Sequence, residues 1–246
     1  MRQNIQEIAR NASAAHELDG FWSLIHGQLE QRGVSGVLFG VFASKRELEH
    51  LKLSKALIWK SSYKQEFFDA FDEGSLLDND VTAEHCVRQN DLLFWHDMNN
   101  WQNASPMEIK RANIERDLGF AIGFTVPSSF YFPNQSGGIG ISMPNVPVRE
   151  FERFWKQEGR DLVTICGILD AGMRGQHMSE FVNLSKREVE CLTWLAVGLR
   201  PEQIADRFGI GDKSIEKYIA GARRKLKART RDHAVAKALM FGLINP

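Results

Sequence analysis

Residues 184–226 read LSKREVECLTWLAVGLRPEQIADRFGIGDKSIEKYIAGARRKL, and this stretch decides how the C-terminal part of the chain folds. Ser185 and Glu188 have the spacing of a capping box, in which the serine caps a helix start and the glutamate closes the cap. Apolar residues then recur at helical spacing until Gly198, which ends this first helix.

A tight turn is expected to join the next two helices. Pro201 begins a short second helix, Gly209 ends it, and Gly211 or Asp212 caps the third helix. A fourth helix over 234–242 packs beneath, which predicts a small all-α, four-helix helix-turn-helix domain. The third helix would enter the major groove of double-stranded DNA. Its candidate DNA-binding residues are Lys213, Ser214, Glu216, Lys217, Tyr218, Arg223 and Arg224.

The charge distribution supports a phosphate-binding C-terminal domain. The net charge of the 246 residues is zero, but residues 1–183 carry 18 Lys and Arg against 24 Asp and Glu, whereas residues 184–246 carry 13 against 7. A basic module attached to an acidic body is typical of a DNA-binding domain joined to a domain with another role.

The tail resembles the LuxR-type helix-turn-helix over its whole length. The resemblance rests on the pattern LSxRExECLxW at 184–194 (here LSKREVECLTW), on Gly198, and on RxxAVA at 231–236. It implies a transcriptional regulator that binds DNA as a homodimer. The family's third helix usually carries Thr-Val-x-x-His, where this chain has Ser-Ile-Glu-Lys-Tyr at 214–218, so Glu216 and Tyr218 predict an altered choice of DNA.

The preceding residues predict an α+β sensor domain, an α/β/α sandwich over 1–171 joined by a linker at 172–183 to the domain at 184–246. Apolar spacing predicts helix over 5–32, and glycine-bounded apolar runs predict strands at 36–42 and 57–59. Further helices are expected at 64–71, 81–88, 106–117 and 148–173. Strands at 121–126 and 138–143 flank a hairpin-like turn that includes Pro133 and Asn134.

This body resembles the acyl-homoserine-lactone-binding domain of quorum-sensing LuxR regulators. The spacing of Tyr63, Phe67, Phe71, Asp80 and Trp95, followed by GFTVP at 123–127, carries the resemblance. It implies that Asp80 accepts a hydrogen bond from the ligand amide, that Tyr63 is a hydroxyl partner, and that Trp95 forms an aromatic wall. Thr125 and Ser142 would be hydroxyl contacts, with Trp101 in the apolar lining.

The chain departs from the family where the ligand's polar groups should bind. Phe67 stands where a tryptophan that donates to the lactone carbonyl is expected, and Phe71 lacks the usual tyrosine hydroxyl. Loss of one such buried hydrogen bond costs about 1–3 kcal/mol. Asp80 also has a second interpretation, because a carboxylate beside Asp78 and Asn79 could simply cap a helix.

The sequence gives no sign of a disulfide framework, a metal site, a membrane span or a catalytic site. Cys86, Cys166 and Cys191 are too few and too separated for a disulfide framework or a metal pair, so we expect buried free thiols, no metal and no cofactor. No signal peptide or membrane span is evident, which predicts a cytoplasmic protein. No recognisable catalytic set is present, so an enzyme is not expected.

Three hypotheses remain. The first is a regulator controlled by an acyl-homoserine lactone or a related small amphiphile. The second is a regulator that answers to a different signal or to none. The third is a body that forms heterodimers with a related regulator.

Overall fold

The structure is a computed structural model that describes residues 3–42, 58–71, 78–131 and 136–246. The chain divides into two compact units, Met1–Gly172 and Met173–Pro246, and each is considered by itself. The predicted turn residues Pro133 and Asn134 lie outside the described residues. No helix in the described ranges combines the length and the hydropathy needed to cross a bilayer.

An antiparallel sheet of five strands forms the centre of the first unit, in the order β2-β1-β5-β4-β3. Gly140 of β5 lies opposite Leu38 of β1 and opposite Thr125 of β4, so β5 is the middle strand. The strands are β1 Gly36–Phe42, β2 Ile58–Ser61, β3 Leu93–Phe94, β4 Gly123–Pro127 and β5 Ser136–Ser142.

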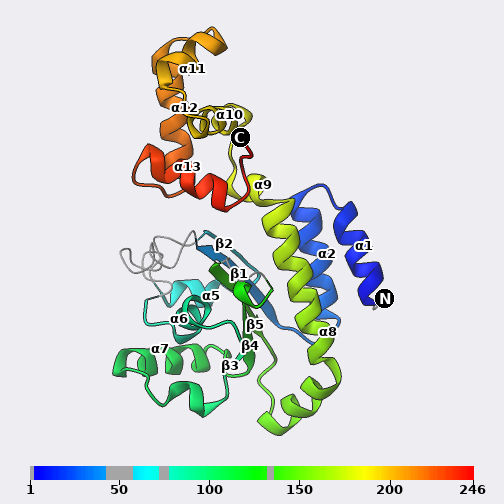
Figure 1. Cartoon of the computed structure of the whole chain (residues 1–246). Coiled ribbons are helices and arrows are strands. Elements are labelled where there is room, and N and C mark those ends of the chain that lie inside the picture. Colours follow the sequence, from blue (N-terminus) through cyan, green and yellow to red (C-terminus); the bar gives the residue numbers. More distant parts are fainter. Residues whose placement is uncertain (1–2, 43–57, 72–77, 132–135) are drawn as a thin grey trace. The chain divides into compact units, whose positions relative to one another are not determined.

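Helices cover both faces of this sheet (Figure 1). On one side lie α1 Ile5–Ala14, α2 Leu18–Glu30 and the long α8 Val148–Gly175. On the other lie α5 Gln65–Asp69, α6 Val81–Arg88 and α7 Pro106–Asp117, with the short 3-10 helices η2 Met98–Trp101 and η3 Ser128–Phe130. The predicted α/β/α sandwich is confirmed.

Period-two alternation gives the two faces of the sheet different compositions. One face carries large apolar side chains that are at most 1% exposed, and it packs on α2 and α8. This face consists of Val37, Phe39, Val41, Phe124, Val126, Ile139 and Ile141. The opposite face is rich in glycine.

All three cysteines are buried and free, as predicted.

The N-terminal helix was predicted as one element over 5–32, and this is wrong. The chain forms α1 and α2 with a break at residues 15–17, where Ala15 adopts extended backbone with φ −80° and ψ 105°. No glycine or proline marks this break, and apolar residues continue at helical spacing beyond it. The sequence pattern therefore gave no signal that the helix ends.

The second unit contains α9 Met178–Val182, α10 Lys186–Ala196, α11 Pro201–Phe208, α12 Asp212–Lys225 and α13 Arg231–Met240. Its predicted boundary signals are confirmed. Ser185 and Glu188 form the capping box of α10, Pro201 starts α11, and Gly209 ends it with φ +65°. Gly211 is the N-cap of α12. The predicted linker at 172–183 contains the last residues of α8 and the whole of α9.

Candidate functional site

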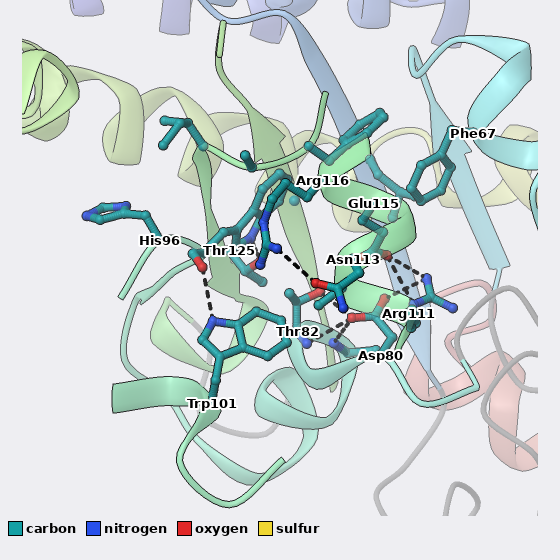
Figure 2. A pocket seen from close by; sticks show the side chains of 18 of the residues that line it. Phe67, Asp80, Thr82, His96, Trp101, Arg111, Asn113, Glu115, Arg116 and Thr125 are labelled. Atoms are coloured by element: carbon teal, nitrogen blue, oxygen red, sulfur yellow. Dashed lines mark hydrogen bonds and ion pairs between the residues drawn. The ribbon is translucent and has the colours of Figure 1, made fainter. Parts of the chain in front are cut away.

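A cavity of about 520 Å³ lies between the glycine-rich face of the sheet and the helices α5, α6 and α7 (Figure 2). This volume falls within the range of roughly 300–1,000 Å³ that is typical of small-molecule sites. Strands β1, β4 and β5 supply its floor. Its lining includes the side chains of Leu38, Tyr63, Phe67, Asp80, Thr82, Cys86, Trp95, His96, Met98, Trp101, Ile109, Arg111, Asn113, Glu115, Arg116, Thr125 and Val148.

Glycines in the floor make room for the side chains that stand on it. A Cβ at Gly123 would lie 2.5 Å from Cε3 of Trp95, and a Cβ at Gly138 would collide with Sγ of Cys86. At Gly140 a Cβ would lie 3.0 Å from the Tyr63 hydroxyl and 3.7 Å from Cζ2 of Trp95. In β4 and β5, glycines on the cavity face alternate with apolar residues that point to the other face. The cavity therefore exists because these glycines have no side chains to fill it.

Asp80 is both a helix cap and part of the cavity wall. Its Oδ1 accepts hydrogen bonds from the backbone N–H groups of Thr82 (2.8 Å) and Ala83 (3.2 Å) and from the Thr82 hydroxyl (2.8 Å). Its Oδ2 faces Nη2 of Arg111 at 3.4 Å. The two interpretations of Asp80 are thus compatible, but both carboxylate oxygens already have partners within the protein.

Arg111 holds two carboxylates at this end of the cavity. Its guanidinium also contacts Glu115 Oε1 at 3.0 Å and donates to the Asp78 carbonyl at 3.2 Å. Burial and, to a smaller extent, the negative charge of Asp80 raise the pKa of Glu115 to about 7 against the opposing effect of Arg111. One guanidinium is therefore shared by a pair of carboxylates, and its charge balances theirs only when Glu115, whose pKa is about 7, is protonated.

Both indoles that line the cavity donate their N–H groups to the protein. Nε1 of Trp95 donates to the Thr125 hydroxyl at 2.9 Å, and Nε1 of Trp101 donates to the Trp95 carbonyl at 3.0 Å. Phe67 has no N–H, and its ring packs against Tyr63 and Phe120. The aromatic walls therefore offer surface to a ligand, and their indole donors are already engaged.

The Tyr63 hydroxyl remains available to a ligand. It lines the cavity and donates to no other group in the described part of the chain. Burial raises the pKa of Tyr63 well above its ordinary value, and the charges of Glu115 and Asp80 act in the same direction. The hydroxyl thus stays protonated and can donate a hydrogen bond to an acceptor in the cavity.

Six of the eight predicted ligand-site residues line this cavity: Tyr63, Phe67, Asp80, Trp95, Trp101 and Thr125. The other two do not. Phe71 is covered by the guanidinium of Arg111, 4.3 Å from its ring centroid, and by Phe67. Ser142 is buried, and its hydroxyl donates to the Gly36 carbonyl at 3.4 Å across the β1–β5 pair.

Sequence reasoning missed the contribution of α7, whose residues Arg111, Asn113, Glu115 and Arg116 line the cavity (Figure 2). The only available signal was the spacing of Arg111 and Glu115, four residues apart, which favours an ion pair on one face of a helix. In the described ranges, no group of three or more His, Cys, Asp or Glu side chains is placed to hold a metal ion.

In the second unit, α12 presents the predicted reading surface. Lys213, Ser214, Glu216, Lys217 and Arg224 are exposed, while Ile215, Ile219 and Ala222 are buried on the opposite side of the helix. Two predicted DNA-binding residues lie differently. Tyr218 is half-buried against the helical core, and the Arg223 guanidinium donates to the Arg229 carbonyl in the following turn.

The Glu188 side chain of α10 contacts α12. Its Oε2 accepts from the backbone N–H of Ser185 and from Nζ of Lys225, both at 2.7 Å. Burial acts to raise the pKa of Glu188, but the hydrogen bonds from Lys225 and Ser185 outweigh it, so the pKa lies below its ordinary value. Gly221 of α12 leaves the necessary space, because a Cβ there would collide with Oε1 of Glu188.

Comparison with protein families identifies both units. Residues 17–171 match the family model described as "Autoinducer binding domain", and residues 182–238 match "Bacterial regulatory proteins, luxR family". The chain belongs to the LuxR family of autoinducer-binding regulators. It is a LuxR-type quorum-sensing transcriptional regulator with a DNA-binding helix-turn-helix, as the sequence resemblance predicted.

Individual relatives of this LuxR-type regulator are distant in sequence. It is 22% identical to the transcriptional activator protein VanR of Vibrio anguillarum, over 99% of this chain and 96% of VanR. It is 24% identical to the quorum-sensing regulator RhlR of Pseudomonas aeruginosa, over 93% and 91% of the two chains. The crystal structure of Escherichia coli SdiA shares the fold, with a TM-score of 0.54 at 17% identity over 98% of both chains.

Proposed function

We propose that this regulator is controlled by a small acyl amphiphile that binds in the cavity of the first unit, with acyl-homoserine lactones as the reference class. The observation that carries the proposal is the cavity itself, because its apolar floor and aromatic walls suit an acyl chain and its polar end suits a head group. A solved complex of SdiA with octanoyl-rac-glycerol, similar in fold to this chain (TM-score 0.52, 18% identity), supports an acyl ligand without a lactone ring.

A non-lactone ligand is the second candidate, and the engaged indoles favour it. A lactone carbonyl needs a donor, but Phe67 has none and the N–H groups of Trp95 and Trp101 are engaged, so among these aromatic side chains only the Tyr63 hydroxyl could serve it. The Asp80 carboxylate, which would accept from an amide, already has four donors around it. An amide-bearing lactone would have to displace one of these contacts, at a cost of about 1–3 kcal/mol.

On the DNA side, we propose a homodimer that places two α12 helices in successive major grooves. The exposed residues Lys213, Ser214, Glu216, Lys217 and Arg224 of α12 would contact bases and phosphates, with Tyr218 and Arg223 at the edge of the surface. The proposed division is a sensor domain over 1–171, a connecting segment over 172–183, and a DNA-binding domain over 184–246. Ligand binding would shift the population of the DNA-binding form of the dimer.

Ligand retention tests the sensor proposal. The full chain is expressed with and without a panel of acyl-homoserine lactones and monoacylglycerols, and the purified protein is extracted and analysed by mass spectrometry. We expect an acyl compound to be retained and to raise the melting temperature. If no acyl compound is retained and none alters DNA binding, the sensor proposal is wrong.

Salt dependence tests the DNA surface. Lys217→Ala should lower affinity and reduce the slope of log K against log salt by about one if Lys217 contacts a phosphate. Lys110→Ala removes the same charge from the exposed surface of α7 in the other unit and serves as the control. Equal slopes for wild type and Lys217→Ala would place the interface elsewhere.

A further inference from the structure

The two arginines of α7 that line the cavity differ in how they are neutralised. Arg111 is 5% exposed and lies between Asp80, Glu115 and a backbone carbonyl. Arg116 has no carboxylate within 4.0 Å among the described residues, and its one hydrogen bond goes from Nη1 to the neutral Oδ1 of Asn113 at 2.8 Å. The cavity wall therefore carries one uncompensated guanidinium.

This guanidinium lines the cavity although its side chain is exposed to solvent. Figure 2 shows Arg116 turned in from α7, with its hydrogen bond to Asn113. Asn113 lies three residues earlier on the same helix, and its amide oxygen fixes one nitrogen of the fork while leaving the others free. Other groups of the lining that can donate hydrogen bonds include the Tyr63 hydroxyl, the Asn113 amide and the His96 ring.

The cavity opens to solvent. Three apolar residues line the cavity and are nevertheless exposed, Met98 at 72%, Ile109 at 47% and Val148 at 39%. The Arg116 side chain is also exposed to solvent. A charged ligand group at this mouth keeps part of its hydration, so it avoids the several kcal/mol that full burial of an ion costs.

The local charges leave room for an anion at Arg116. Asp80 and Glu115 face Arg111, and at neutral pH part of the Glu115 population is protonated because its pKa is about 7. The other titratable side chains that line the cavity are His96 of the loop after β3, and Tyr63 and Cys86, whose pKa values burial raises so that both stay neutral. The wall is thus neutral to positive.

We propose that the cavity selects acyl compounds that end in a carboxylate, with the acyl chain inside and the carboxylate paired with Arg116 at the mouth. A carboxylate matches the planar fork of a guanidinium through two parallel hydrogen bonds, which a neutral lactone cannot form. Fatty acids and N-acyl amino acids share this chemistry. The inference rests on the proposed function, since it requires that the cavity bind an acyl amphiphile at all.

Opening the lactone ring gives a matched pair of probes. N-acyl-homoserine and its lactone share the chain and the amide, and ring opening adds a carboxylate and a hydroxyl. Fatty acids of the same chain length carry the carboxylate without the hydroxyl or the amide, so they show whether the carboxylate alone is sufficient. Binding of short, medium and long chains to the full-length protein is measured by calorimetry. We expect the ring-opened compound or the fatty acid to bind about ten-fold more tightly than the lactone, or better.

Variants of Arg116 identify the residue responsible. Arg116→Gln should weaken binding of the acids by about ten-fold or more and change binding of the lactone by less than about three-fold. Arg116→Lys keeps the positive charge but not the planar guanidinium, so its affinity for the acids should lie between those of wild type and Arg116→Gln. Lys110→Gln removes a charge from the exposed surface of the same helix and should bind like wild type. Unchanged melting temperatures would confirm that the variants fold.

Two results would overturn the inference. If the lactone binds as tightly as the acid, or if Arg116→Gln weakens both equally, the carboxylate assignment is wrong while the acyl-sensor proposal stands. If no acyl compound of either kind binds at any chain length, both proposals fail together.

Discussion

The two faces of the central sheet are built from the same strands and have opposite properties. The face toward α2 and α8 is filled by side chains such as Phe39, Phe124 and Ile141, which are fully buried. The face toward α5, α6 and α7 has glycine at 123, 138 and 140 and encloses the cavity. Because neighbouring residues point to opposite faces, one strand can contribute to stability and to binding through separate positions.

The largest expected effect is on the filled face. Phe124→Ala removes a ring that is 0% exposed and stacks edge-on against Trp155 at 4.8 Å, so we expect the free energy of unfolding to fall by about 3–5 kcal/mol. Denaturant titration followed by tryptophan fluorescence measures it. Leu38→Ala, on the cavity face, should cost clearly less. Equal losses would show that the two faces do not differ as proposed.

The cavity face should carry a pH dependence that the filled face lacks. The pKa of Glu115 is about 7 in the folded chain and near 4.5 ordinarily, so the folded state binds more protons between these values. Its contribution to stability is therefore highest below about pH 4.5 and falls by roughly 3 kcal/mol as the pH rises through about 7.

Glu115→Gln removes this titration. The difference in unfolding free energy between variant and wild type should thus grow in favour of the variant over the same pH range, as measured by denaturant titration at each pH. A difference that does not change with pH would contradict the environment described for Glu115.

A third comparison uses two adjacent residues of β5. Gly140→Val adds methyl groups to the cavity, where the nearest atom is the Tyr63 hydroxyl, and should lower ligand affinity about ten-fold or more while changing stability by about 1 kcal/mol. The Ile139 side chain points to the other face, so Ile139→Val should lower the free energy of unfolding by about 0.5–1.5 kcal/mol and leave ligand affinity unchanged. The reverse pattern would mean that β5 is not the cavity floor.

The smallest effect is expected at Ser142. Its hydroxyl makes one long hydrogen bond, to the Gly36 carbonyl, and it does not line the cavity. Ser142→Ala should therefore change the unfolding free energy by less than about 1 kcal/mol and leave ligand binding as in wild type. A clear loss of binding, measured by calorimetry, would restore Ser142 to the ligand site that the sequence predicted.

The fold was largely predictable because its signals are local. The capping box of Ser185 and Glu188, the proline at 201 and the glycine at 209 lie beside the helix ends that they mark, and the apolar run of β1 is explicit in the sequence. The break at 15–17 was not predictable, since Ala-His-Glu has no conformational preference strong enough to end a helix. Tertiary packing of α1 and α2 decides it.

The site was predictable only where family spacing marks it. That spacing identified Asp80 and Trp95. It could not show that Arg111 forms an ion pair with Asp80 or that the Thr125 hydroxyl accepts a hydrogen bond from the Trp95 N–H. Phe71 was placed in the ligand wall, although Arg111 covers its ring. Helix α7 carries no clear apolar stripe, so its sequence does not show which side faces the sheet, and these contacts depend on that orientation.

The Glu188 carboxylate has a mechanical consequence for the DNA-binding unit. One oxygen of this side chain completes the start of α10 and anchors the end of α12, with Gly221 allowing the close approach. Rotation of α12 about its own axis would break the Lys225 bond and leave the buried Glu188 carboxylate without its cation. The α12 surface that we propose to contact DNA is therefore held as a rigid part of its unit, and a signal that acts as proposed would change its presentation and leave its shape intact.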